Sequence, residues 1–249
     1  MNARTVEILD TTLRDGVQSA GVVFSLEDKI KLVRALDSLG VRYIEAGNPF
    51  SNPKDAELFR FARDKLKLKN ARLAAFGMTR RPGAAAEDDP GLRAILDSGA
   101  HIASIVGKSC AFQVREVLGK TLEENLRMIE DTVRFLTESG MAVFFDAEHF
   151  FDGYSDDPDY ALETLRAAER GGAERLVLCD TNGGTLPGAV AGAVSARLRS
   201  SGRRSRSTAT TTPDSRPPRR FSRSRRGLCR CRARSTATAS GAATRTSAR

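Results

Sequence analysis

The feature that most constrains the fold of this chain is a repeat, in which short apolar runs alternate with longer segments of helical period. Six apolar runs of this kind precede residue 199. Such an alternation is typical of successive βα units that build a parallel sheet. The expected strands cover residues 6–10, 41–47, 71–77, 101–107, 141–148 and 174–180.

The segments between the expected strands carry helix signals. In residues 26–39 apolar side chains recur every three to four positions, Ser25 precedes the segment as an N-cap, and Asp28 lies in its first turn. Residues 122–138 form a second such segment. Glycines lie just before four of the strands, where a helix C-cap or tight turn favours them: Gly40, Gly99, Gly140 and Gly172. We therefore expect an α/β fold, a (β/α)₈ TIM barrel that is incomplete here, with about six βα units.

The pattern stops near residue 199. Residues 201–249 hold 14 Arg, no Lys and one acid, Asp214, so this part carries a charge of +13 and the first 200 residues carry −4. Arg, Ser, Thr, Ala and Pro dominate the tail, and such a composition cannot bury enough apolar surface to offset the entropy of ordering. We expect residues 1–198 to form a partial catalytic barrel and residues 199–249 to be a disordered tail foreign to it.

The composition excludes several classes of protein. No apolar run is long enough for a membrane span, and the polar amino terminus lacks a signal core, so a cytoplasmic protein is expected. The four cysteines show neither CxxC spacing nor a regular disulfide framework, and we expect free thiols at Cys110, Cys179, Cys229 and Cys231.

Polar residues gather at the ends of the expected strands. Asp10 ends the first, Asn48 follows the second, Glu148 ends the fifth, and Asp180 with Thr181 closes the sixth. In a parallel barrel the site lies at these carboxyl ends, and converging carboxylates suit a divalent cation. For each carboxylate taken alone, the alternative role is to cap the following helix or to pair with a nearby Arg.

The two histidines have different expected roles. His149 follows Glu148 and is either a ligand or a supporting residue, because adjacent side chains on one strand face opposite sides. His101 opens a strand at the far end of the barrel, where a structural role is favoured.

Four sequence strings resemble those of acyl-CoA condensing enzymes and lyases, the family of isopropylmalate, citramalate and homocitrate synthases and hydroxymethylglutaryl-CoA lyase. LDTTLRDGVQ (9–18) is similar to the opening signature of the whole family. The other three resemble the citramalate synthase branch in particular: SNPKDAELF (51–59), DAEHFFDGY (146–154) and LVLCDTNGGTLP (176–187). The resemblance covers residues 5–198.

The resemblance implies a Claisen condensation of acetyl-CoA with a 2-keto acid, pyruvate giving citramalate. Arg14 is then expected to stabilise the keto-acid oxygen, Glu148 to assist proton removal from the acetyl methyl, and Thr181 to bind the keto-acid carboxylate. Asp15 is implied as a ligand of Mg²⁺ or Mn²⁺, with Zn²⁺ as an alternative. Asp10 and Asn48 are expected to support these groups from behind. A homodimer is the family expectation.

The chain departs from the family after residue 198. The family's HxH metal ligands, its following Asn-Asp pair and its later NGYGERCGNA segment are missing, and the chain has two histidines in all. Read one base earlier, codons that fit residues 207–215 give His-Gly-His-Asn-Asp-Thr-Gly-Leu, and codons that fit residues 235–246 give the second motif. Residues 228–234 likewise permit Val-Gln-Val-Gln-Gly-Thr-Ile. We infer a frameshift between residues 195 and 206, which leaves an open sheet with an unpaired edge and an inactive, aggregation-prone polypeptide.

The same residues are compatible with other functions. The chain is alternatively a 2-isopropylmalate or homocitrate synthase, or a lyase that runs the cleavage direction. In a different class, the basic tail is a nucleic-acid-binding arm on an enzyme remnant, because clustered Arg side chains bind phosphates in a salt-dependent way.

Overall fold

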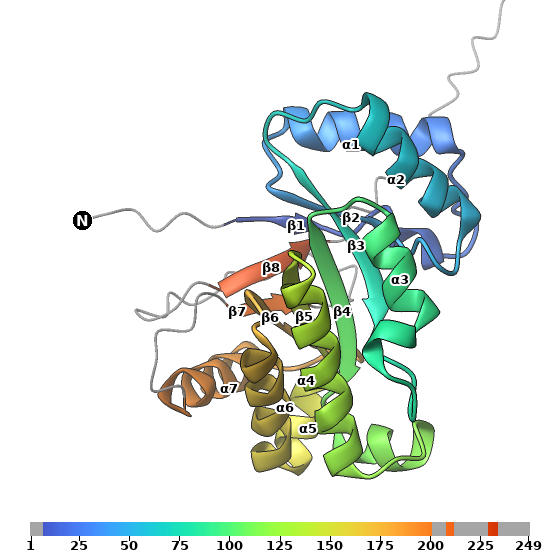
Figure 1. Ribbon diagram of the computed structural model, residues 1–249. Coiled ribbons are helices and arrows are strands. Elements are labelled where there is room, and N and C mark those ends of the chain that lie inside the picture. The colour runs from blue at the N-terminus through green and yellow to red at the C-terminus, as the bar shows by residue number, and fades with distance from the viewer. Residues whose placement is uncertain (1–6, 201–207, 212–228, 234–249) are drawn as a thin grey trace, which may run out of the picture.

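The computed structural model describes residues 7–200, 208–211 and 229–233 of the 249. Eight parallel strands form one closed barrel in chain order (Figure 1). They are β1 (Leu9–Asp10), β2 (Tyr43–Gly47), β3 (Arg72–Met78), β4 (Ile102–Lys108), β5 (Ala142–Glu148), β6 (Arg175–Cys179), β7 (Thr208–Thr211) and β8 (Cys229–Ala233). The barrel fold and its first six strands confirm the prediction from the sequence, to within three residues at each strand boundary.

Each of the first six strands is followed by a helix. The α-helices are α1 (Leu26–Ser38), α2 (Pro53–Lys65), α3 (Pro90–Asp97), α4 (Leu122–Glu138), α5 (Phe150–Asp156), α6 (Pro158–Gly171) and α7 (Pro187–Ser200). Short turns of other helix types cover Gly16–Gln18 (η1), Ala86–Asp88 (η2) and Gln113–Val117 (η3). Ser25 is the N-cap of α1, as expected, and Asp28 completes a capping box with it. Among the described residues, no helix combines the length and apolar character that crossing a bilayer needs.

Two short strands from the tail correct one expectation. β7 pairs with β6 from Leu176↔Thr208 to Cys179↔Thr211, and β8 pairs with both β7 and β1. The prediction of an open sheet with an unpaired edge is therefore wrong, because strand pairing uses backbone groups that any residue except proline supplies. The tail expected to be disordered contributes these two strands, and its residues 201–207, 212–228 and 234–249 lie outside the described part.

The core has two layers, as the alternation of side chains along a strand requires. The main cluster lies between the strands and the surrounding helices, where α4 and α6 lie side by side (Figure 1). A smaller cluster fills the barrel interior and consists of Leu9, Tyr43, Ala74, Ile102 and Phe144. The rings of Tyr43 and Phe144 meet edge to face at 5.0 Å between centroids. These apolar side chains fill the interior toward the amino ends of the strands, so the polar side chains of the interior lie toward the carboxyl ends.

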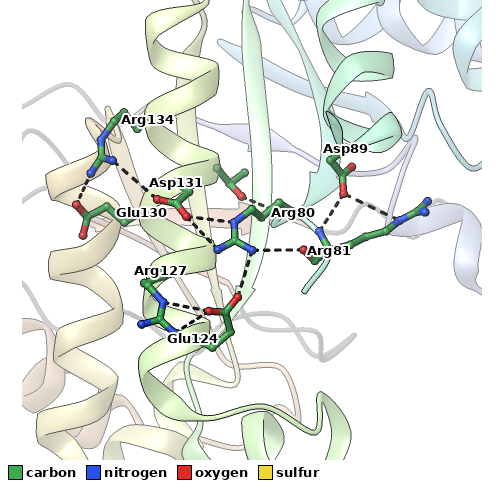
Figure 2. Close-up of polar contacts among 9 residues, drawn as sticks. Arg80, Arg81, Asp89, Glu124, Arg127, Glu130, Asp131 and Arg134 are labelled. Atoms are coloured by element: carbon green, nitrogen blue, oxygen red, sulfur yellow. Dashed lines mark hydrogen bonds and ion pairs between the residues drawn. The ribbon is translucent and has the colours of Figure 1, made fainter. Parts of the chain in front are cut away.

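Arg80 joins the chain after β3 to α4 (Figure 2). Its guanidinium lies 3.0 Å from the Asp131 carboxylate and 3.2 Å from that of Glu124, and its side chain is 8% exposed. Its backbone N–H donates to Thr132 Oγ1 at 2.8 Å. The next residue, Arg81, donates its N–H to Asp89. This cluster fixes the course of the β3–α3 loop along the rim of the barrel.

Replacing Arg80 by alanine is expected to lower the free energy of unfolding by about 2 kcal/mol, between the values typical of buried and exposed ion pairs. The loss arises because the half-buried carboxylates of Asp131 and Glu124 lose the guanidinium that they share and keep only the exposed Arg134 and Arg127 as cationic partners. Urea unfolding measures it. Lys31→Ala is the control, because Lys31 pairs with Glu27 where both side chains are well exposed, and a change below about 0.5 kcal/mol is expected. Equal losses for the two variants contradict the prediction.

Candidate active site

The turn after β1 presents Arg14 and Asp15 at the carboxyl end of the barrel. The backbone N–H groups of Arg14, Asp15 and Gly16 all point at the carbonyl oxygen of Thr11, at 3.1, 2.8 and 3.1 Å. Leu13 anchors the turn, because its side chain is fully buried in the main core. The turn therefore has a defined shape, and Arg14 leaves it in a fixed direction.

Arg14 is held on two sides. Its Nε donates to Glu45 Oε2 at 2.7 Å, and its guanidinium carbon lies 4.0 Å from the centre of the Phe76 ring. Glu45 belongs to β2 and is completely buried, whereas the Arg14 side chain keeps 14% of its surface exposed. A carboxylate and a ring face preorganise the guanidinium, as a group that stabilises developing negative charge requires.

A network of buried oxygens continues from Glu45 across the barrel interior. Ser104 of β4 donates to Glu45 Oε1 at 2.7 Å and lies 3.3 Å from Asp146 Oδ2 of β5. Asp10, which accepts hydrogen bonds from Thr12, is also buried. Burial raises the pKa of the Asp10 carboxyl, and the charge of Glu45 adds to the rise. Asp10 and Asn48 were each expected to support the catalytic groups. Asp10 lies near Glu45, whereas Asn48 Oδ1 accepts hydrogen bonds from the N–H groups of Phe50 and Ser51 within its own loop.

Glu148 and Lys108 form an ion pair at the ends of neighbouring strands. Lys108 Nζ lies 2.6 Å from Glu148 Oε2, and the two side chains are 18% and 27% exposed. The two residues are also register partners in the β4–β5 ladder. Lys108 therefore places a positive charge next to the carboxylate that the sequence singled out, where negative charge on a substrate would be stabilised.

Thr181 lies beside the end of β5. Its Oγ1 accepts a hydrogen bond from the backbone N–H of His149 at 2.8 Å. His149 itself lies outside β5 and adopts a left-handed backbone with φ 55°. The expectation that Glu148 and His149 face opposite sides of one strand is therefore wrong, because the strand ends at Glu148. His101 lies at the opposite end of the barrel, just before β4, as expected.

The described side chains do not supply a complete metal site. Asp15, the expected ligand, is 26% exposed and lies 3.5 Å from Arg14 Nη1. Among residues 7–200, 208–211 and 229–233, no group of three or more His, Cys, Asp or Glu is arranged to hold a metal ion. One carboxylate beside a guanidinium does not fit the ligand set of a bound divalent cation. Of the four cysteines, Cys110 and Cys179 are buried free thiols, as expected.

Several residues of this site were not predicted from the sequence. Glu45, Ser104, Lys108, Asp146 and Asp152 all make contacts there. A signal existed for Glu45, because a carboxylate inside an otherwise apolar strand needs a buried partner. Lys108 ends β4 as Glu148 ends β5, and the shared position at the strand ends was an equally readable signal.

Comparison with known proteins shows that the chain is similar to citramalate and 2-isopropylmalate synthases in sequence and to HMG-CoA lyases in fold. The HMGL-like family model matches residues 5–201. An (R)-citramalate synthase of Aquifex aeolicus is 52% identical over 185 residues, which are 74% of this chain and 35% of that protein. The 2-isopropylmalate synthase 2 of Caldanaerobacter subterraneus is 33% identical over 181 residues, 72% of this chain and 44% of that protein. The crystal structure of a Bacillus subtilis HMG-CoA lyase superposes with a TM-score of 0.67 at 21% identity, covering 84% of this chain and 68% of that one. The chain thus spans about a third of the length of the citramalate synthase it matches.

Proposed function

The chain belongs to the HMGL-like family, and we propose that it is the catalytic body of an enzyme that condenses acetyl-CoA with pyruvate to give citramalate and free CoA. The observation that carries the proposal is the preorganised Arg14, held by Glu45 and Phe76 at the end of β1. The higher identity to a citramalate synthase than to a 2-isopropylmalate synthase supports pyruvate as the keto acid.

The site residues have these roles in the proposed reaction. Glu148 takes a proton from the acetyl methyl group, and the resulting carbanion attacks the keto carbon of pyruvate to form the new C–C bond. The keto oxygen gains the negative charge, which Arg14 stabilises before the oxygen is protonated. Thr181 binds the pyruvate carboxylate. Water then cleaves the thioester, and CoA leaves as the thiol.

The tail is proposed to be the out-of-frame product of the segments that complete the barrel. β7 (Thr208–Thr211) and β8 (Cys229–Ala233) fall within residues 207–215 and 228–234, the segments whose alternative reading gives HGHNDTGL and VQVQGTI. The coincidence supports a frameshift, because strands seven and eight belong at these places in the closed barrel. Asp15 then lacks the two histidines of the family motif, and the chain as written is proposed to be inactive.

Companion properties are proposed with this function. A homodimer and a cytoplasmic location are proposed for the intact protein, and Mg²⁺ or Mn²⁺ is the proposed metal once both histidines are restored. The nucleic-acid-binding tail is disfavoured by the same coincidence of strands and recovered motifs. A DNA affinity of the chain that falls steeply with salt would favour it.

Substrate choice tests the proposed activity. The gene is expressed in the restored frame, and CoA release from acetyl-CoA is followed with pyruvate, 2-oxoisovalerate or 2-oxoglutarate as the second substrate. The proposal expects the highest kcat/KM with pyruvate. A preference for 2-oxoisovalerate indicates a 2-isopropylmalate synthase instead, and a preference for 2-oxoglutarate a homocitrate synthase. Cleavage of hydroxymethylglutaryl-CoA without any condensation indicates a lyase.

A further inference from the structure

His149 has an unusual backbone at the edge of the site. Its φ of 55° and ψ of 32° place it in the left-handed region, and among the described residues it is the one non-glycine with positive φ. A bulky residue adopts this conformation at a cost in energy and needs surrounding contacts to keep it there. Such residues gather at functional sites. The hydrogen bonds that hold His149 in this conformation therefore indicate its role at the site.

Two hydrogen bonds join the β5–α5 segment to the loop after β6, and a third lies within that segment. The backbone N–H of His149 donates to Thr181 Oγ1 at 2.8 Å. The imidazole Nδ1 lies 3.1 Å from Asp152 Oδ2, and Asn182 Nδ2 donates to the same oxygen at 2.9 Å. Asp152 thus contacts the side chain of His149 and that of the residue after Thr181. We call His149, Asp152 and Asn182 the Asp152 latch.

We propose that the Asp152 latch is a positioning device that fixes the direction of the Thr181 hydroxyl for the substrate carboxylate. The inference rests on the proposed function, in which Thr181 binds that carboxylate. Because Thr181 Oγ1 accepts the His149 N–H, its hydroxyl hydrogen must point elsewhere and is available to donate to an anion. The left-handed backbone is what directs the His149 N–H at Thr181, and Asp152 holds the ring that keeps this backbone in place.

The imidazole has a defined protonation pattern in this arrangement. A carboxylate accepts hydrogen bonds, so its partner Nδ1 carries the proton in the neutral ring, and Nε2 is the unprotonated nitrogen. An orienting carboxylate fixes the tautomer of histidine in the same way in catalytic triads and metal sites. The pattern gives a spectroscopic signature that simple packing of the ring does not produce.

The tautomer of His149 is the first test. The 249-residue chain, labelled with ¹⁵N at histidine, gives two sets of ring signals, from His149 and from His101. The latch predicts that the neutral form of the His149 ring carries its proton on Nδ1, and that this preference is lost in Asp152→Asn, whose amide can donate to the ring. Asp156→Asn is the matched control, since Asp156 is an exposed acid on the same helix α5, and no change is expected. A His149 with the same tautomer in all three proteins overturns the proposal.

Backbone exchange and pyruvate affinity complete the test. The backbone amide hydrogen of His149 is expected to exchange with solvent about ten-fold faster in both Thr181→Val and Asp152→Asn, as loss of one hydrogen bond predicts. In Asp156→Asn the exchange rate is expected to stay the same. Unchanged exchange in Asp152→Asn shows that Asp152 does not hold the backbone and overturns the latch. In the restored reading frame, pyruvate is expected to bind about ten-fold more weakly to Asp152→Asn than to the parent protein, and equal affinity overturns the positioning role. If the restored parent protein binds no pyruvate while the tautomer and exchange results hold, the proposed function fails and the latch is supported.

Discussion

Restoring the alternative reading frame near codon 200 is expected to raise the rate of citramalate formation by at least on the order of a thousand-fold over the 249-residue chain. The reason is that Asp15 needs two histidines beside it to complete the ligand set of the divalent metal. The chain as written has two histidines, His101 at the opposite end of the barrel and His149 bonded to Asp152 through Nδ1, so neither joins Asp15. The measurement is the release of free CoA from acetyl-CoA in the presence of pyruvate.

The histidines of the restored segment provide the control for this prediction. Changing both of them to alanine in the restored chain leaves its length and its frame intact, and is expected to return the rate to that of the 249-residue chain. An active chain as written, at ordinary metal concentrations, contradicts the prediction. A restored chain that keeps its full rate without these histidines contradicts the assigned reason.

Gly153→Ala is expected to lower the free energy of unfolding by about 3 kcal/mol or more, as overpacking against a fixed neighbour does. A Cβ at Gly153 would lie 2.3 Å from the carbonyl oxygen of Ser109 and 2.7 Å from the Cα of Cys110. Both are backbone atoms of the segment after β4, so no side-chain rotation can relieve the contact. Helix α5 would have to move away from the barrel, and Asp152 would move with it.

Gly192→Ala is the matched control for the close approach. Gly192 also lies in a helix, α7, but nothing lies within 4 Å of a Cβ built there. Alanine is therefore expected to leave stability unchanged or to raise it by up to about 1 kcal/mol. Urea unfolding of both variants measures the difference. A Gly153→Ala protein as stable as the Gly192→Ala protein would show that α5 can move away without cost.

Much of the barrel could be predicted from the sequence because local signals and tertiary structure agree. Ser25 and Asp28 begin α1 as their spacing indicates, and Gly40, Gly99, Gly140 and Gly172 take the positive φ of a helix C-terminus. The closing strands could not be predicted, because their sequences, TATT and CRCRA, lack the apolar run that marks a buried strand. These strands pair through backbone hydrogen bonds, which the pattern of side chains in a sequence does not reveal.

The candidate site was partly predictable for a related reason. Glu148 and Thr181 stood out because they lie at strand ends, whereas Arg14 and Asp15 were implied by the resemblance of LDTTLRDGVQ to a known family signature. Their partners lie far away in the sequence: Glu45 is 31 residues from Arg14 and Ser104 is 59 residues from Glu45. Such pairs follow from the register between strands, which one sequence does not specify. The left-handed turn at His149 was also missed, since a histidine carries no strong signal for positive φ.

The measurement that tests the central claim most directly is the DNA sequence of the gene from codon 190 to well beyond the stop codon. The claim is that a citramalate-synthase-type barrel continues in another frame. It predicts one inserted or deleted base between codons 195 and 206, after which the gene reads through His-x-His-Asn-Asp and NGYGERCGNA. A confirmed frame, whose alternative reading does not continue into these motifs, contradicts the claim and leaves residues 201–249 as the genuine end of this barrel.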